Sequence, residues 1–293
     1  MQSNMYSLEN EYLTIAVNSK GAELQRVFGR KDQIEYMWNG DPAFWSKHSP
    51  VLFPIVGALK ADTYYLNDKA YQLGRHGFAR DMEFAVTTQS ADRLVFTLES
   101  NAETLFKYPF AFRFDISYEL FQNSIKVSYR VGNTGKSILY FSVGGHPAFR
   151  IPLTADTVYS DYYLEFNQRE RAVRWPISKD GLIESRPVEL LNDTNQLPLT
   201  KELFQKDALV FKGLLSNSVA LKSGKTKHGL RLDFTGFPYL GIWAAKNADF
   251  VCIEPWCGIA DSVDTDQQLA TKEGIHSLQP AKDFERTWSV TVF

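Results

Sequence analysis

The chain has 293 residues and a formal net charge of −2, and apolar residues make up 44% of it. This balance offers no basic surface to nucleic acid or to an anionic membrane, and no apolar run is long enough to cross a bilayer. The length fits one large domain or two ordinary ones, with enough apolar residues for a sizeable core.

Aromatic residues account for 14% of the chain, which favours strands over helices. The two cysteines, Cys252 and Cys257, are too few for a disulfide framework and have no second ligand pair for a zinc site. Residues 1–6 lack the basic and apolar regions of a signal peptide. We therefore expect a cytoplasmic protein without a metal or cofactor.

Alternating apolar residues at the start of the chain predict an antiparallel meander. Leu13, Ile15 and Val17 share one face of the first strand, and short polar turns separate it from the next two. Residues 42–48 do not alternate and predict a turn of helix. Prolines flank the apolar run within residues 50–57, which predicts a loop or sheet edge that enters the core.

The middle of the chain has the most regular pattern. A helical turn is predicted at residues 102–108, just before Pro109. Residues 112–120 and 125–131 then alternate apolar and polar side chains, as expected of a hairpin with one buried and one wet face. Residues 176–200 hold several prolines and predict a looser region.

Few later segments have helical periodicity, and no repeat or linker divides the chain. We expect one all-β domain over residues 1–293, most consistent with a large antiparallel β-sandwich. A short helix is expected at residues 202–205. The expected strands are residues 12–17, 22–28, 33–38, 64–66, 69–73, 83–88, 93–100, 112–120, 125–131, 138–144, 158–166, 169–175, 208–211, 218–221, 229–234, 239–244, 250–253 and 284–293.

The strand expected at residues 250–253 leads into Glu254, Pro255 and Trp256. Proline cannot donate to a strand ladder, so we place Glu254 at the end of this strand. A carboxylate beside a tryptophan is partly desolvated, which raises its pKa and suits a general base. The alternative is an exposed glutamate just past the strand.

Two of the five histidines have a distinctive setting. His76 and His146 each stand beside glycine at an expected strand exit, where the backbone can bend sharply. The alternative for each is a histidine that caps a strand end through backbone hydrogen bonds. We expect His48 and His228 at the surface and His276 in a structural role.

Two imidazoles and a carboxylate, without a nucleophile motif or phosphate loop, favour proton transfer at two oxygens of one small substrate. A sugar hemiacetal is such a substrate. A base takes the proton of the anomeric hydroxyl and an acid protonates the ring oxygen. The ring opens, the C1–C2 bond turns, and the ring closes on the other face. Aromatic side chains would stack on the sugar.

Five segments resemble, in order and spacing, the aldose 1-epimerase (galactose mutarotase) family, in its bacterial galactose mutarotase-related branch. The resemblance covers nearly the whole chain and implies the galactose mutarotase-like supersandwich fold, in agreement with the expected strands. The segments are Phe53-Pro54-Ile55-Val56-Gly57, His76-Gly77-Phe78-Ala79-Arg80, Gly144-Gly145-His146-Pro147-Ala148-Phe149, Asp207-Ala208-Leu209 and Cys252-Ile253-Glu254-Pro255-Trp256.

The resemblance implies a role for each matching residue. Glu254 is similar to the family's general base and His146 to its general acid. His76 resembles the histidine that contacts the ring oxygen or a neighbouring hydroxyl, and Asp207 the aspartate that anchors sugar hydroxyls. Trp256 is expected to contact the substrate as well. The implied partner is a sugar, bound by a monomer or homodimer.

One position departs from the family pattern. The arginine that binds sugar hydroxyls in the family falls on Ala58 of this chain. Either Lys60 or Arg75 replaces it, or the substrate differs from free galactose. We expect Arg75, because it is the neighbour of His76.

Three other functions stay open. A hexose-6-phosphate mutarotase needs a basic pocket, which Arg75, Arg80 and Lys60 would supply. A non-catalytic carbohydrate-binding protein needs aromatic side chains but no acid–base pair. A glycosidase would use Glu254 and Asp207 as paired carboxylates.

The acidic run from Asp261 to Asp266 invites comparison with a calcium site. It lacks the glycine and the final glutamate of a calcium-binding loop. We therefore expect a solvated loop.

Overall fold

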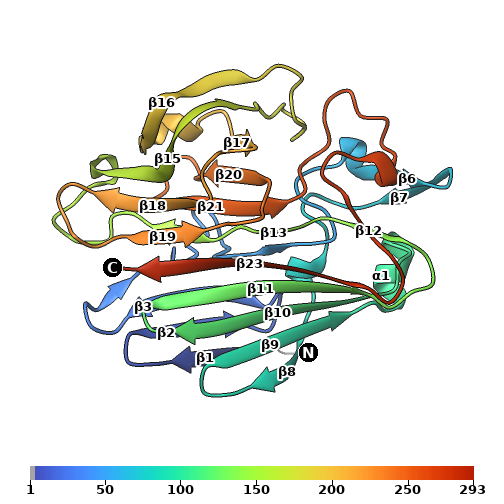
Figure 1. Ribbon diagram of the computed structural model, residues 1–293, viewed down its shortest axis with the longest axis horizontal. Helices are drawn as coiled ribbons and strands as arrows, with labels where there is room; N and C mark the ends of the chain where they lie inside the picture. Colours follow the sequence, from blue (N-terminus) through green and yellow to red (C-terminus); the bar gives the residue numbers. More distant parts are fainter. Residues whose placement is uncertain (1–3) are drawn as a thin grey trace.

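The computed structural model describes residues 4–293, whose regular secondary structure is mostly antiparallel strands (Figure 1). The expectation of an all-β fold is confirmed. The N-terminal expectation falls partly on residues 1–3, which lie outside the described residues. No helix in the described part of the chain is long and apolar enough to span a membrane.

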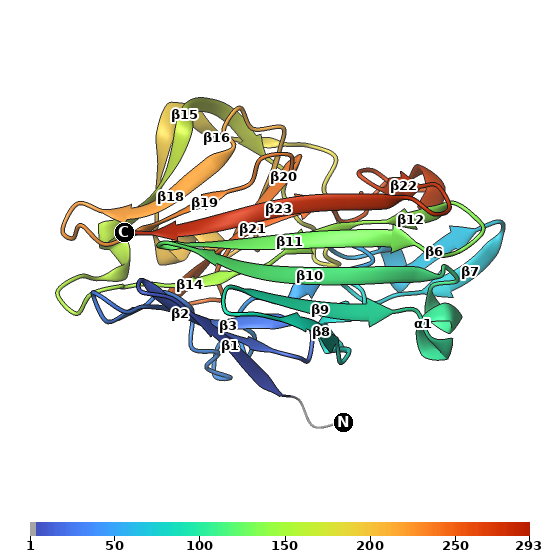
Figure 2. The same ribbon diagram turned by 60° about the horizontal axis from the view of Figure 1, so that its bottom comes forward.

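The largest sheet has nine strands in the order β16-β15-β18-β19-β23-β11-β10-β9-β8 (Figure 2). Its centre is the hairpin predicted from alternation, in which Phe121 of β10 faces Ser124 of β11. The strands are β8 (Ala85–Gln89), β9 (Arg93–Glu99), β10 (Phe112–Phe121), β11 (Ser124–Asn133), β15 (Tyr162–Arg174), β16 (Val188–Pro198), β18 (Ser218–Ser223), β19 (Leu230–Asp233) and β23 (Asp283–Val292).

A six-stranded sheet carries or adjoins four of the five segments that the sequence singled out, and residues 76–80 lie outside it. Its order is β17-β20-β21-β13-β5, and β14 also pairs with β21. Every residue of β21 is buried. The strands are β5 (Val51–Leu52), β13 (Val143–Gly145), β14 (Ala148–Arg150), β17 (Leu209–Lys212), β20 (Tyr239–Trp243) and β21 (Phe250–Cys257).

Smaller sheets complete the fold. They are built from β1 (Met5–Glu9), β2 (Leu13–Asn18), β3 (Glu23–Gly29), β4 (Ile34–Glu35), β6 (Thr63–Leu66), β7 (Lys69–Gln72), β12 (Leu139–Phe141) and β22 (His276–Leu278). Helix α1 (Ala102–Lys107) lies near the predicted place, and Asn101 caps it in a capping box. Short 3₁₀ turns occur at Lys60–Asp62, Ala79–Asp81, Tyr159–Asp161, Lys201–Phe204 and Leu269–Thr271.

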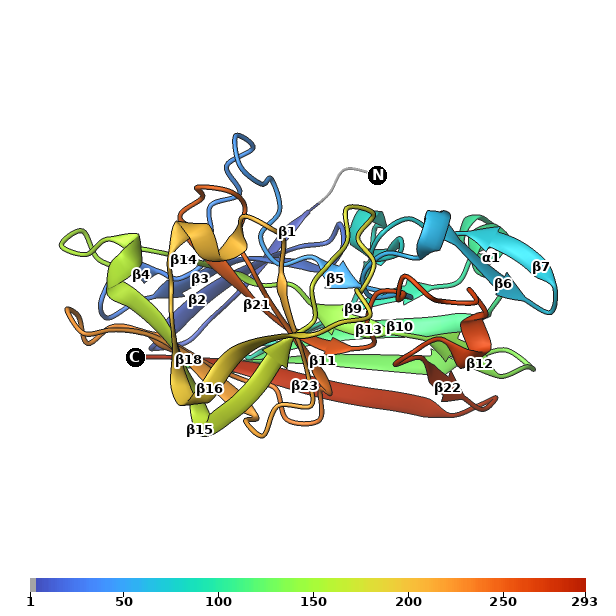
Figure 3. The ribbon, with the colours of Figure 1, turned by 90° about the horizontal axis from the view of Figure 1, so that it is seen from above.

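Aromatic side chains join the two large sheets into one core. Seen from above, β5 and β21 lie over β10, β11 and β23 (Figure 3). Phe53, next to β5, stacks on Phe114 of β10 with ring centroids 4.4 Å apart. It also meets Phe112 edge-on at 5.1 Å. The proline-flanked segment therefore enters the core, as predicted.

Three local predictions are wrong. Residues 188–198, expected to be loose, form strand β16. Residues 42–48 form turns rather than helix. Strand β21 continues through Pro255 to Cys257, so Glu254 lies inside the strand rather than at its end. Hydrogen-bonded and non-bonded pairs alternate along an antiparallel ladder, so one missing N–H need not end the strand.

Candidate active site

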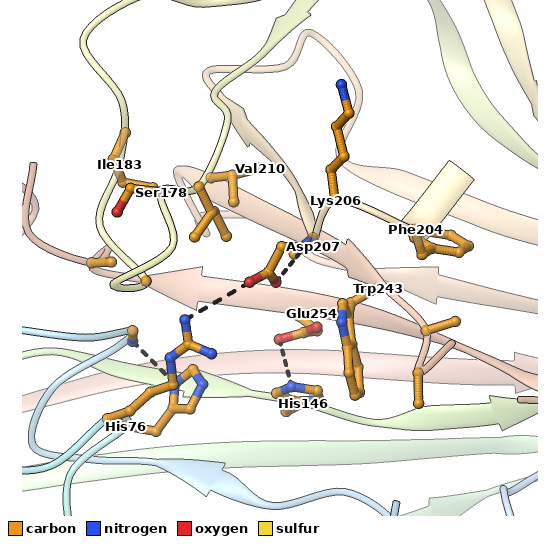
Figure 4. A pocket seen from close by; sticks show the side chains of 18 of the residues that line it. His76, His146, Ser178, Ile183, Phe204, Lys206, Asp207, Val210, Trp243 and Glu254 are labelled. Atoms are coloured by element: carbon orange, nitrogen blue, oxygen red, sulfur yellow. Dashed lines mark hydrogen bonds and ion pairs between the residues drawn. The ribbon is translucent and has the colours of Figure 1, made fainter. Parts of the chain in front are cut away.

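A cavity of about 650 Å³ opens beside β21 and β20 (Figure 4). Its volume lies within the range of small-molecule sites in proteins. All six residues singled out from the sequence line it, although they come from segments far apart in the chain. They are Arg75, His76, His146, Asp207, Glu254 and Trp256.

Strand register brings His146 opposite Glu254. Gly144 of β13 faces Trp256, and Ala148 of β14 faces Cys252, both on β21. His146 is the residue midway between these two pairings, and Glu254 is midway on the other side. Glu254 and Trp256 are two residues apart, so they point to the same face of β21. The sheet itself therefore places the acid, the imidazole and the indole together.

Glycines leave room for the indole of Trp256. A Cβ added at Gly241 would lie 2.5 Å from the ring, and one at Gly144 would lie 2.8 Å from it. Ring atoms normally stay well beyond these distances from a carbon atom. The two neighbouring strands are therefore built to hold a large flat side chain at this wall of the cavity.

The closest polar contact between two side chains of the cavity joins His146 and Glu254. Nε2 of His146 lies 3.2 Å from Oε2 of Glu254, and their side chains are only 10% and 2% exposed. Trp45 stacks on the imidazole at 4.9 Å, and Trp243 meets it edge-on at 5.7 Å. The close-up shows Glu254 directed at His146, with Trp243 beside both. The two groups are thus fixed within proton-transfer distance.

Burial favours the neutral form of both groups. It raises the pKa of Glu254 well above 4.5, and the charge of Asp207 adds to this rise, while Trp256 and Arg75 act in the opposite direction. Burial also lowers the pKa of His146 to about 3, with Arg80 and Arg75 contributing. Between these two pKa values the pair holds a single proton.

A backbone N–H from another segment holds the His76 ring in one tautomer. The N–H of Gly57 donates to Nδ1 of His76 at 3.0 Å, so the ring proton lies on Nε2. Burial, His146 and nearby arginines lower the pKa of His76 well below 6.5. The ring lies 5.8 Å from that of His146. His76 therefore presents a neutral N–H donor.

Two of these residues have strained backbones. His76 has φ +68° and Asp207 has φ +101°, both in the region that favours glycine. The Asp207 carboxylate accepts from its neighbour Ala208 N at 2.7 Å. Strained residues persist where the surrounding structure enforces them, and they are common at functional sites. Both therefore fit a role in ligand binding.

Of the two cations considered for the family's arginine position, only Arg75 lines the cavity. Its guanidinium lies 4.0 Å from the Asp207 carboxylate and passes close to Gly181 and Ala58. The ammonium of Lys60 instead donates to Val263 O at 2.9 Å.

Several lining residues gave no signal in the sequence. Trp45 and Trp243 pack on His146 but stand in unremarkable segments. Lys179, Lys206 and Lys246 are exposed loop residues on the cavity wall. They border the cavity only because three separate loops meet there, so no local pattern could reveal them.

Cys252 is the one thiol near the pair. Its Sγ and the ligand atoms of His146 and Glu254 lie within 4.8 Å of one another. Cys252 does not line the cavity, and burial raises the pKa of its thiol well above 9.0. Of the three residues, only His146 and Glu254 line the cavity.

Two predictions about other polar residues are wrong. His228, expected to be solvated, is only 15% exposed and lies 4.0 Å from the Asp32 carboxylate. Asp261, expected in a solvated loop, is buried and paired with Lys272 at 2.9 Å. The structural role expected of His276 is confirmed, because its ring packs on two phenylalanines.

The chain is similar to known proteins over nearly its whole length. The family model described as aldose 1-epimerase matches residues 4–269. The chain is 34% identical over 295 residues to the chromosomal protein LacX of Lactococcus lactis subsp. lactis, covering 97% of this chain and 98% of that one.

Two solved structures are similar over almost their whole length. The galactose mutarotase related enzyme from Lactobacillus acidophilus has a TM-score of 0.95 and 36% identity, covering 99% of this chain and 97% of that one. A galactose mutarotase-like protein from Lactobacillus casei ATCC 334 has a TM-score of 0.93 and 32% identity, covering 99% and 100%.

Proposed function

The chain belongs to the aldose 1-epimerase family, and from this premise we propose that it interconverts the α and β anomers of a hexose. The observation that carries the proposal is the buried pair of Glu254 and His146, 3.2 Å apart on the wall of a sugar-sized cavity. We propose further that a single domain performs the reaction in the cytoplasm without a metal or cofactor, as a monomer or homodimer.

Each half of the pair has one task. The single proton of the pair first passes from Glu254 to His146, whose facing atoms lie 3.2 Å apart, and this leaves Glu254 as a carboxylate and His146 as an imidazolium. The Glu254 carboxylate then takes the proton from the anomeric hydroxyl, so C1–O1 becomes a carbonyl and the bond from C1 to the ring oxygen breaks. His146 gives its proton to that oxygen. After the C1–C2 bond turns, the two transfers run in reverse and the ring closes on the other face. The single proton of the pair is therefore conserved in each turnover.

The other lining residues recognise the sugar. The Nε2–H of His76 donates to the ring oxygen or an adjacent hydroxyl, and Asp207 accepts from hydroxyls. Arg75 takes the place of the family's arginine, because it is the cation beside Ala58. Trp256 and the tryptophans around His146 offer apolar surface to the sugar ring.

A second candidate is a hexose 6-phosphate. Five cationic residues line the cavity against two carboxylates, and one of the two, Glu254, favours its neutral form. A positive cavity favours an anionic substituent on the substrate. The cations are Arg75, Arg80, Lys179, Lys206 and Lys246.

A non-catalytic carbohydrate-binding protein is the third candidate. Within the described residues, Nδ1 of His146 has no hydrogen-bond partner, and Oε2 of Glu254 lies 3.2 Å from Nε2 of His146 without forming an aligned hydrogen bond. Burying polar atoms without partners is unfavourable. A binding protein gains nothing from such a pair, whereas an acid–base catalyst uses it directly. This observation favours the enzyme.

Anomeric exchange tests the proposal. Saturation-transfer proton NMR would follow exchange between the anomers of galactose, glucose and glucose 6-phosphate, with Glu254→Gln as control. Exchange with a free sugar that disappears in the variant supports the mutarotase. Exchange only with the phosphate ester moves the assignment to the second candidate. Sugar binding without exchange of any of them overturns the enzymatic proposal.

A further inference from the structure

Asp261 and Lys272 form an ion pair that takes no part in the proposed proton transfer. Their charged atoms are 2.9 Å apart, and their side chains are 2% and 3% exposed. Taking two charges out of water is unfavourable, so a buried ion pair is weak evidence for a role in stability alone. The groups that the pair contacts indicate a different role.

The pair is bonded to the backbone that precedes the strained histidine. One carboxylate oxygen of Asp261 accepts from Lys60 N at 3.0 Å, and Asp261 N donates to Ala58 O at 2.9 Å. The ammonium of Lys272 donates to Ile259 O at 2.6 Å. Residues 58–60 are therefore fixed to the pair at both ends.

Gly57, the residue that precedes this segment, makes two hydrogen bonds to His76. Gly57 donates to Nδ1 of His76 at 3.0 Å, and Gly57 O accepts from His76 N at 2.9 Å. Gly57 also lies so close to Ala260 that a side chain there would overlap it. Any shift of the segment held by Asp261 would move the donor that keeps the His76 proton on Nε2.

A second connection leads to Arg75. Asp261 O accepts from Ile183 N at 2.8 Å, and Ile183 lies on the wall of the cavity near Ser178. In the same loop, Gly181 lies against the Arg75 guanidinium, with no room for a side chain between them. The Asp261–Lys272 pair is therefore connected to both His76 and Arg75, the two residues proposed to bind the sugar from this wall of the cavity.

We propose that Asp261 and Lys272 are positioning residues for sugar recognition. They hold the Gly57 N–H against Nδ1 of His76, and they hold the loop that supports Arg75. The consequence for sugar affinity rests on the proposed function, whereas the consequence for the His76 ring does not. Loss of the pair therefore disturbs sugar binding and leaves the Glu254–His146 proton transfer intact.

Lys272→Met tests the proposal, with Lys212→Met as the matched control. Lys212 pairs with Glu273 at 2.7 Å, beside Lys272, and no hydrogen bond connects it to residues 57–60. In the Lys272 variant we expect KM to rise about tenfold at unchanged kcat, as when one or two hydrogen bonds are disturbed. The control should keep the wild-type KM.

A spectroscopic arm is independent of turnover. Long-range ¹H–¹⁵N NMR of the His76 ring should show a single Nε2–H tautomer in the wild type and in Lys212→Met, and mixed tautomers in Lys272→Met. Asp261→Asn, which is isosteric and keeps an acceptor for Lys60 N, is the second variant if Lys272→Met does not fold.

A folded Lys272 or Asp261 variant with wild-type KM and an unchanged His76 tautomer would overturn the proposal. So would a lower melting temperature without either change, because the pair would then only stabilise the fold. If the wild type catalyses no anomeric exchange, the proposed function fails, and the tautomer of His76 still decides this inference.

Discussion

The two walls of the cavity are built differently. One wall is formed by a sheet. Glu254 and Trp256 lie within β21, and His146 lies between β13 and β14, which both pair with β21. The other wall is loop: Arg75, His76 and Asp207 lie between strands, two of them at positive φ. The sheet wall holds the buried acid–base pair, and the loop wall holds the more exposed groups.

The difference follows from what each wall has to do. Proton transfer requires two groups held about 3 Å apart, and strands in register give that precision. Recognition of a sugar requires several groups whose chemistry varies with the substrate, and loops tolerate such variation. We therefore expect changes in the sheet wall to reduce kcat and changes in the loop wall to raise KM.

Glu254→Gln should have the largest effect. The amide still accepts hydrogen bonds but cannot take a proton, so kcat should fall by about 10²–10⁴-fold, the usual contribution of a general base. KM should stay within about twofold of wild type. Saturation-transfer NMR on the preferred sugar measures both. Wild-type turnover in this variant would place the base elsewhere.

His146→Asn should lower kcat by a similar or slightly smaller factor, on the order of 10²-fold. Asparagine can donate a hydrogen bond to the ring oxygen but cannot deliver a proton. The same exchange measurement checks it, with Trp243→Phe as a control for packing around the ring. A change confined to KM would assign His146 to binding and weaken the contrast between the walls.

The pH dependence should reflect the pair rather than two separate groups. The pKa of Glu254 is raised well above 4.5 and that of His146 is lowered to about 3, so the pair keeps one proton from about pH 3 up to the raised pKa of Glu254. Turnover should stay level through pH 4.5, fall in stronger acid as the pair gains a second proton, and fall in base as the pair loses its only proton. A fall on acidification centred near pH 4.5 would mean that Glu254 titrates as an ordinary carboxylate.

Asp207→Asn should act mainly on KM. Loss of a charged acceptor for sugar hydroxyls should raise KM about tenfold, with kcat within about threefold of wild type. The variant also removes a charge that raises the pKa of Glu254, so the alkaline fall in turnover should move to lower pH. Steady-state exchange across pH checks both. A loss of kcat alone would give Asp207 a part in the chemistry.

Treatment with a strong chelator should have the smallest effect, which is none. Proton transfer between Glu254 and His146 requires no metal, and Cys252, the third residue of the set, does not line the cavity. Turnover of protein dialysed against the chelator should equal that of untreated protein. If the chelator inactivates the protein and zinc restores its activity, the metal-free acid–base mechanism is wrong.

The sequence by itself determined the strand content and the chemistry-bearing segments. Alternation over residues 112–120 and 125–131 predicted the hairpin of β10 and β11, because a strand with one wet face shows period two. The rarity of histidine, and glycine beside His76 and His146, was enough to single out two imidazoles. The tryptophan beside a strand end singled out Glu254, the family resemblance supplied Asp207, and the position next to His76 indicated Arg75. All of these residues line one cavity.

The tertiary structure decided everything that depends on contacts between distant segments. Sequence rules placed Glu254 at the end of its strand, but pairing with β20 carries β21 past Pro255. They also placed Asp261 in solvent, but Lys272 and the backbone of Lys60 bury its charge. Burial, pKa and the partners of a charge are set by neighbours that fold in from elsewhere, and local patterns carry no record of those neighbours.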